Sequence, residues 1–135
     1  MKEMTIEAKT DNLDRVLAAV EEVLEEGGCA MKDQLQIDVA VEEIFVNIAH
    51  YAYTPDVGSA TLQMSVEDEP RRFVMTFIDS GVPYDPLAKE DPDVSLPLEE
   101  RQIGGLGIYM VKKSMDAVRY EYTDGRNILT IEKEF

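Results

Sequence analysis

Glu43 and Asn47 lie four residues apart in a stretch that has the periodicity of a helix. At about 100° per residue, that spacing puts both side chains on one face. An apolar stripe from Val41 to Ala52 lies opposite. An Asn oxygen is a hard, neutral ligand suited to Mg²⁺, and a carboxylate one turn away can accept a hydroxyl proton. The solvated side of an amphipathic helix explains the same face, so the helix alone leaves both interpretations open.

A second polar group, Asp79-Ser80-Gly81, comes directly after the apolar run 72–78. An Asp in such a place often caps a turn. An ionised carboxylate only accepts hydrogen bonds, so a partly buried Asp79 suits the exocyclic N–H of adenine and opposes the guanine carbonyl. Gly81 lacks a Cβ and would let the backbone approach a ring closely.

A glycine cluster, Gly104-Gly105-Leu106-Gly107, precedes a helical pattern that starts at Ile108. Exposed backbone N–H groups and the positive end of a helix together form a site for phosphate oxygens. The spacing matches neither the dinucleotide-binding fingerprint nor a P-loop. Arg101 lies just upstream and is a candidate charge partner for a phosphate.

Three helices and five strands must position these residues. Apolar residues at helical spacing predict helices over about 12–26, 32–53 and from 108 onward, with Gly27-Gly28 as a stop signal. Alternating residues predict strands near 4–8, 60–66, 72–78, 118–123 and 128–135. Four of the six prolines lie between Pro83 and Pro97, where we expect no regular structure. This order of elements predicts helices packed on one face of a mostly antiparallel sheet.

Composition narrows the function classes. The 135 residues carry 13 Lys+Arg against 28 Asp+Glu, a net charge of −15, which disfavours direct binding to nucleic acid or to an anionic membrane. No stretch approaches the roughly 18 apolar residues of a membrane helix, and the first residues lack the apolar core of a signal peptide. A lone Cys29 has no disulfide partner within the chain. We therefore expect one cytoplasmic domain over residues 1–135.

The order of the three motifs, with an acid and an Asn on a helix, Asp-x-Gly after a strand and glycines opening a helix, resembles the Bergerat-fold ATP-binding superfamily. That superfamily includes gyrase, Hsp90, histidine kinases and MutL, and the chain is most similar to its anti-sigma-factor serine/threonine kinases. The resemblance covers nearly the whole chain. It implies an α/β two-layer sandwich with a mixed, mostly antiparallel sheet and helices on one face.

The resemblance also implies a role for each motif. Asn47 corresponds to the Mg²⁺ ligand and Glu43 to the catalytic carboxylate, with Glu42 the less favoured base. Asp79 and Gly81 correspond to the adenine-recognising box. The cluster Gly104-Gly105-Leu106-Gly107 corresponds to the box that meets the phosphates, through Gly105 and Gly107 above all. Residues from about 84 to 103 correspond to the ATP lid, in which Arg101 could reach a terminal phosphate.

The function that the resemblance implies is an ATP- and Mg²⁺-dependent serine/threonine protein kinase. Its substrate would be an anti-sigma-factor antagonist with a STAS domain, and a sigma factor would be a second partner. Two alternatives stay open: a catalytically silent, nucleotide-gated module that sequesters a partner, and a histidine-kinase catalytic domain whose acceptor His lies in another chain. The alternating N-terminal strand also offers an edge for a homodimer.

Overall fold

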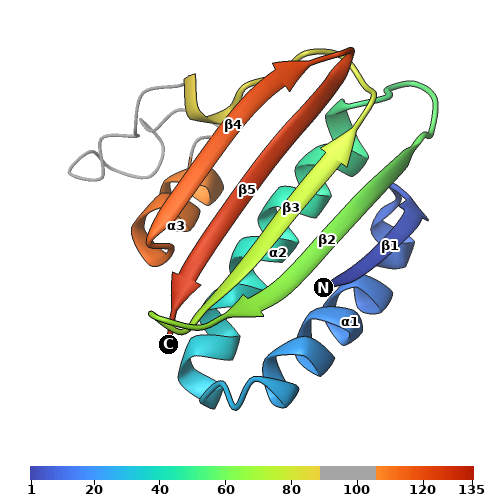
Figure 1. Cartoon of the computed structure of the whole chain (residues 1–135). Helices are drawn as coiled ribbons and strands as arrows, with labels where there is room; N and C mark the ends of the chain where they lie inside the picture. The colour runs from blue at the N-terminus through green and yellow to red at the C-terminus, as the bar shows by residue number, and fades with distance from the viewer. Residues whose placement is uncertain (89–105) are drawn as a thin grey trace.

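The computed structural model describes residues 1–88 and 106–135 of the chain. They form a five-stranded sheet in the order β1-β2-β3-β5-β4, with three α-helices (Figure 1). The strands are β1 (Lys2–Glu7), β2 (Ser59–Glu67), β3 (Arg72–Asp79), β4 (Ala117–Thr123) and β5 (Arg126–Glu134). The helices are α1 (Leu13–Glu26), α2 (Met31–Tyr51) and α3 (Leu106–Ser114), with 3-10 turns η1 (Thr10–Asn12) and η2 (Pro86–Ala88).

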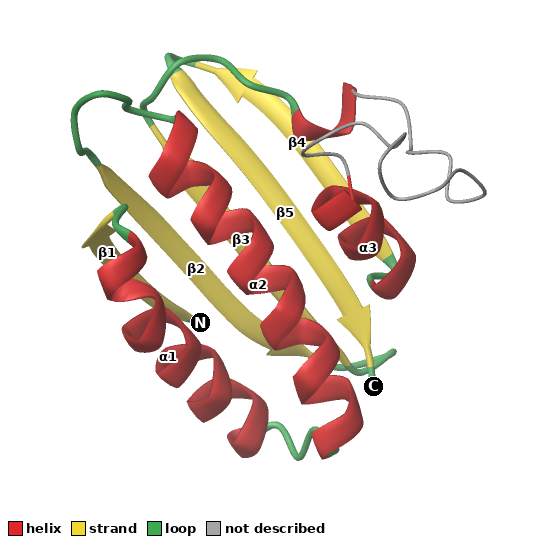
Figure 2. Ribbon diagram, turned by 180° about the vertical axis from the view of Figure 1, so that it is seen from behind, coloured by secondary structure: helices red, strands yellow, loops and turns green. Residues whose placement is uncertain are grey.

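The helices cover one face of the sheet, as Figure 2 shows from behind. Strand residues alternate accordingly, so that Phe73, Met75 and Phe77 on β3 are buried while their neighbours are half-buried on the other face. The core fills the space between this inner face and the apolar sides of α1 and α2, including Val16, Leu24, Ile37, Val41 and Phe45. The predicted α/β two-layer sandwich is therefore confirmed.

All four strand pairings among the described residues are antiparallel, so the mixed character expected of the sheet is not found there. The chain leaves β3, crosses through α3 and returns on β4. A tight turn at Asp124 and Gly125, both with positive φ (52° and 76°), then folds β5 back between β3 and β4. This insertion keeps β3 and β4 from pairing directly.

The predicted stop signal ends α1 by a left-handed cap. Gly28 adopts a φ of +76°, which favours glycine. The Cys29 N–H donates to the Leu24 carbonyl at 3.0 Å, and the Gln34 side chain donates to the Cys29 carbonyl at 2.9 Å. These bonds satisfy backbone groups where the chain reverses into α2.

The proline-rich segment departs from the expectation at its start. Within the described residues it contains the short turn η2, which the Asp85 carboxylate supports by accepting the Leu87 N–H at 2.8 Å. Residues 89–105 of the expected lid lie outside the described residues. Among the helices that are described, none has both the length and the apolarity to cross a bilayer.

Asp38 is a partly buried carboxyl on α2. Its Oδ1 is shielded from solvent and has no hydrogen-bond partner within residues 1–88 and 106–135. Burial raises the pKa of Asp38 from 3.8 to about 6, and the negative charge of Glu21 adds to the shift. The native carboxyl therefore holds its proton to higher pH than the unfolded one. Ionised Asp38 costs stability above about pH 6, and the cost vanishes as the pH falls toward about 4.

We expect Asp38→Asn to raise the free energy of unfolding near neutral pH by ~1 kcal/mol, a value reduced for partial exposure, and to give no gain near pH ~4. Urea unfolding at the two pH values measures the difference. Glu42→Gln, at an exposed acid on the same helix, controls for the loss of one negative charge. A gain of the same size at both pH values contradicts the account.

Candidate functional site

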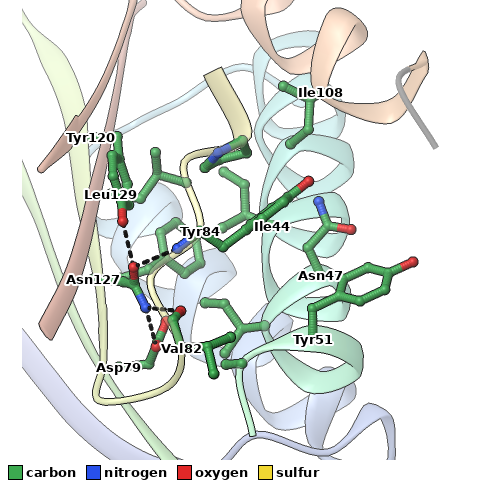
Figure 3. A pocket seen from close by; sticks show the side chains of 14 residues that line it. Ile44, Asn47, Tyr51, Asp79, Val82, Tyr84, Ile108, Tyr120, Asn127 and Leu129 are labelled. Atoms are coloured by element: carbon green, nitrogen blue, oxygen red, sulfur yellow. Dashed lines mark hydrogen bonds between the residues drawn. The ribbon is translucent and has the colours of Figure 1, made fainter. Parts of the chain in front are cut away.

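A cleft opens between α2, the ends of β3 and β5, and the loop that follows β3 (Figure 3). About 40 Å³ of it has room for the centre of a water molecule, so the cleft is narrow, and it opens to solvent on one side. Its walls are mostly apolar with a few polar groups. They are formed by Ile44, Asn47, Ile48, Tyr51, Ala52, Phe77, Asp79, Val82, Tyr84, Pro86, Ile108, Tyr120, Asn127 and Leu129.

Asp79 is the last residue of β3 and belongs to the inner face of the sheet. Only 6% of it is exposed, so its carboxylate needs hydrogen bonds to be tolerated there. Oδ1 accepts the Gly81 N–H at 2.9 Å and the Asn127 amide at 2.9 Å. The Gly81 bond is the turn cap considered from the sequence, and Asp79 also lines the cleft, so both interpretations of this residue fit the structure.

Gly81 is required for a reason that the sequence did not reveal. A Cβ built on it would lie 2.2 Å from the Ala52 carbonyl oxygen, at the end of α2. The same carbonyl accepts the Val82 N–H at 2.9 Å. Gly81 therefore permits close packing of the loop against α2, while Val82, and not Gly81, is among the residues that line the cleft.

Asn47 lies on the side of α2 that turns toward the cleft, and Glu43 lies one turn before it on the same helix. Asn47 lines the cleft, and both residues are half-buried, whereas Glu42 is exposed. Neither Glu43 nor Asn47 has a side-chain hydrogen-bond partner within the described residues. The Asn47 oxygen is therefore available to a ligand. Which of the two acids, Glu42 or Glu43, acts as the base stays a prediction.

Gly107, from the second glycine motif, lies directly against Glu43 of the helix motif. A Cβ built on Gly107, the second residue of α3, would lie 2.0 Å from Glu43 Oε2 and 2.7 Å from its Cδ. Only a glycine lets the carboxylate approach the start of α3 so closely. Leu106 is the first residue of that helix. Arg101, Gly104 and Gly105 lie outside the described residues.

The donor set fits Mg²⁺ better than a metal held wholly by protein. No group of three or more His, Cys, Asp or Glu side chains that could hold a metal ion occurs in the part of the chain described here. Mg²⁺ usually keeps several waters and takes one or two protein oxygens plus phosphates. A single half-buried Asn47 beside the cleft is compatible with that mode.

Asn127 and three tyrosines, Tyr51, Tyr84 and Tyr120, line the cleft without having been predicted from the sequence. The sequence predicts Asn127 within a turn over residues 124–127, where it has no chemical signal of its own. The structure instead places Asn127 on β5, opposite Asp79 in the β3–β5 register. The rings of Tyr51 and Tyr84 are 6.2 Å apart. Burial raises the pKa of Tyr120, whose hydroxyl contacts Asn127, so this phenol stays protonated near neutral pH.

The model of one family, the histidine kinase-like ATPase domain, matches residues 6–133. The chain belongs to that family. The match spans both the cleft and the elements that build it, so the cleft described above is the candidate nucleotide site of a histidine kinase-like ATPase domain.

Relatives of known name agree with this assignment. The chain is 28% identical over 131 residues to the serine-protein kinase RsbW of Bacillus cereus strain B4264, covering 94% of this chain and 81% of the relative. The RsbU and RsbW domains of Rv1364c from Mycobacterium tuberculosis superpose with a TM-score of 0.63 at 17% identity, over 99% of this chain and 32% of that one.

A second solved structure, the SiaB-SiaC complex from Pseudomonas aeruginosa, matches with a TM-score of 0.60 at 16% identity, over 98% of this chain and 89% of that one. At these identities the two structural matches establish the fold alone. They show that the arrangement of sheet and helices recurs in both of those proteins.

The contact between Glu43 and Gly107 predicts a non-additive effect on stability. Alanine is favoured over glycine within a helix, but a methyl group at residue 107 forces the carboxylate aside. We expect Gly107→Ala to be neutral within ~0.5 kcal/mol in the parent chain, and to stabilise by ~1 kcal/mol in a Glu43→Ala background.

Urea unfolding of the four proteins in this cycle measures the coupling. A Glu42→Ala background is the matched control, because Glu42 is exposed and its removal should leave the effect of Gly107→Ala unchanged. Additive energies in the Glu43 cycle would show that the carboxylate does not pack on Gly107.

Proposed function

We propose that the chain binds Mg·ATP in the cleft and transfers the γ-phosphoryl group to a serine or threonine hydroxyl of a protein. One observation carries this proposal. Three segments far apart in the sequence meet here: Asp79 and Asn47 line the cleft, and Glu43, one turn before Asn47, packs against Gly107 at the start of α3. A buried hydrogen-bond acceptor, a neutral oxygen ligand and a carboxylate beside a helix N-terminus are the groups that ATP-dependent phosphoryl transfer needs.

The adenine end of the site lies at Asp79 in this proposal. Its carboxylate accepts the exocyclic N–H of adenine and opposes the guanine carbonyl. The apolar walls, including Ile48, Val82 and Leu129, suit the faces of a purine ring. Gly81 contributes indirectly, because its close packing on Ala52 holds the loop beside α2.

The phosphate end lies toward α3. Asn47 would hold Mg²⁺, which when bound neutralises charge on the phosphate oxygens. The backbone at Gly107 opens α3, and we propose that Gly104, Gly105 and Leu106 join it in meeting the phosphates. We propose a lid over residues 84–103, from which Arg101 reaches the terminal phosphate.

Glu43 acts on the acceptor. The acceptor hydroxyl oxygen attacks the γ-phosphorus, the bond from that phosphorus to the β–γ bridging oxygen breaks, and ADP leaves. The hydroxyl proton passes to the Glu43 carboxylate. Because phosphoryl transfer depends mostly on positioning and charge neutralisation, the carboxylate also serves to orient the hydroxyl in line.

The proposed acceptor is a STAS-domain anti-sigma-factor antagonist, and a sigma factor is the proposed second partner. Relatives named serine-protein kinases support the reaction class, and the SiaB-SiaC complex offers a precedent for a protein of this fold bound to another protein. We propose that the chain acts in the cytoplasm. We also propose that residues 1–135 form one ATP-binding domain. The pairing of two copies into a homodimer remains part of the hypothesis.

We expect Glu43→Ala to leave the affinity for ATP within a few-fold and to slow phosphoryl transfer about 10²-fold or more, because the proton acceptor is lost. Transfer of label from γ-labelled ATP to purified STAS-domain proteins measures the rate. Glu42→Ala is the matched control and should retain transfer. Unchanged turnover in the Glu43 variant would remove its assignment as the base.

We expect Asp79→Asn to weaken ATP binding by about 1–3 kcal/mol, because a charged acceptor is exchanged for a group that can turn a donor toward the adenine amino group. Calorimetric titration measures the loss, with circular dichroism to verify folding. Equal affinity in parent and variant would exclude Asp79 from adenine recognition.

The labelled product also separates the alternatives. Phosphoserine and phosphothreonine survive acid treatment, whereas phosphohistidine does not, so an acid-labile label would favour a histidine kinase. ATP binding without label on any partner would favour the sequestering module.

A further inference from the structure

We propose that Asn127 is a positioning residue that sets the purine preference of the cleft, by fixing which oxygen of Asp79 faces the nucleotide base. The inference rests on the proposed function, since it concerns how Asp79 meets adenine. Asn127 lies on β5 directly opposite Asp79 on β3 and is only 7% exposed.

The Asn127 amide uses all of its hydrogen-bonding capacity (Figure 3). Its Nδ2 donates to Asp79 Oδ1 and to the Val82 carbonyl, each at 2.9 Å. Its Oδ1 accepts the Tyr84 N–H at 3.2 Å and the Tyr120 hydroxyl. An amide has two donors and two lone pairs, so this side chain is saturated.

The partners also fix the orientation of the amide. The Tyr84 N–H can only donate, so the group facing it must be the oxygen Oδ1. The Val82 carbonyl can only accept, so the group facing it must be Nδ2. A flipped amide would break both bonds, and Asn127 therefore presents a donor to Asp79 in a single geometry.

This geometry gives the two carboxylate oxygens of Asp79 different roles. Oδ1 is held by two donors, Asn127 Nδ2 and the Gly81 N–H. No donor from residues 1–88 or 106–135 reaches Oδ2, while Asp79 lines the cleft. The oxygen left for a ligand, Oδ2, is thus only an acceptor and has a defined direction. It favours binding of the adenine amino group and disfavours the guanine carbonyl.

Only an amide side chain at residue 127 can make all four of these hydrogen bonds, two as donor and two as acceptor. A carboxylate at residue 127 would accept from Tyr84 and Tyr120 but would repel Asp79, and an apolar side chain would leave the Val82 carbonyl without its bond. Asn127 acts through Asp79 and need not touch the base.

The test compares ATP with purine riboside triphosphate, which lacks the 6-amino group. The ratio of their dissociation constants isolates the contact at Asp79, because sugar and phosphates are the same. We expect the parent chain to prefer ATP by about 10-fold or more. In Asn127→Asp the preference should fall to about two-fold or less near pH ~8 and recover near pH ~5.5, where the paired carboxyls share a proton.

Two further variants keep the test decisive. Tyr120→Phe removes one donor to Asn127 Oδ1 and should lower the preference two- to three-fold even if Asn127→Asp fails to fold. Thr130→Val is the matched control, because Thr130 lies on β5 with its hydroxyl bonded to Thr76 on the other face of the sheet. It should keep the parent preference.

A preference that survives in Asn127→Asp and Tyr120→Phe would overturn the inference, and so would equal weakening of both nucleotides, which is the signature of a merely structural role. A parent chain that binds both nucleotides equally would overturn the adenine contact itself, and the inference with it. Binding of neither nucleotide would instead reject the proposed function.

Discussion

The fold depends on a buried carboxylate at the end of its middle strand. Asp79 is placed on the inner face of β3, where an unsatisfied charge would cost several kcal/mol. Two donors make this position tolerable, and both come from specific features of the chain. The Gly81 N–H requires a tight turn after β3, and the Asn127 amide requires β5 to pair with β3 in one register. The turn, the register and the strand order are tied together by this one group.

α2 serves the core and the cleft with different faces. Ile37, Val41 and Phe45 are fully buried against the sheet. Another face of α2 carries Asn47, which lines the cleft, and Glu43, which packs against Gly107. The glycines at 81 and 107 let other segments approach this helix at distances that a Cβ would forbid. The cleft therefore owes its shape to close backbone packing as much as to its side chains.

Hydrophobic periodicity and glycine stop signals predicted the architecture well, because amphipathic helices, alternating strands and helix ends are encoded locally in the sequence. The helices 13–26 and 31–51 match the expected elements closely, and the turn predicted over residues 124–127 is shorter in the structure, at Asp124 and Gly125. Of the motif residues, Asn47 and Asp79 line one cleft and Glu43 packs against Gly107, while their chemical roles stay predictions. Asn127 could not be found in this way, because its importance arises from a register between strands 48 residues apart. The role of Gly81 was also hidden, since it depends on how α2 ends beside the loop.

The central claim is that this cleft selects adenine through Asp79 and requires Mg²⁺ through Asn47. Calorimetric titration with ATP and with GTP, each in the presence and absence of Mg²⁺, tests both halves at once. The account predicts saturable binding of ATP that strengthens with Mg²⁺, and binding of GTP at least about 10-fold weaker. Equal affinity for the two nucleotides, or ATP binding that ignores Mg²⁺, would contradict it.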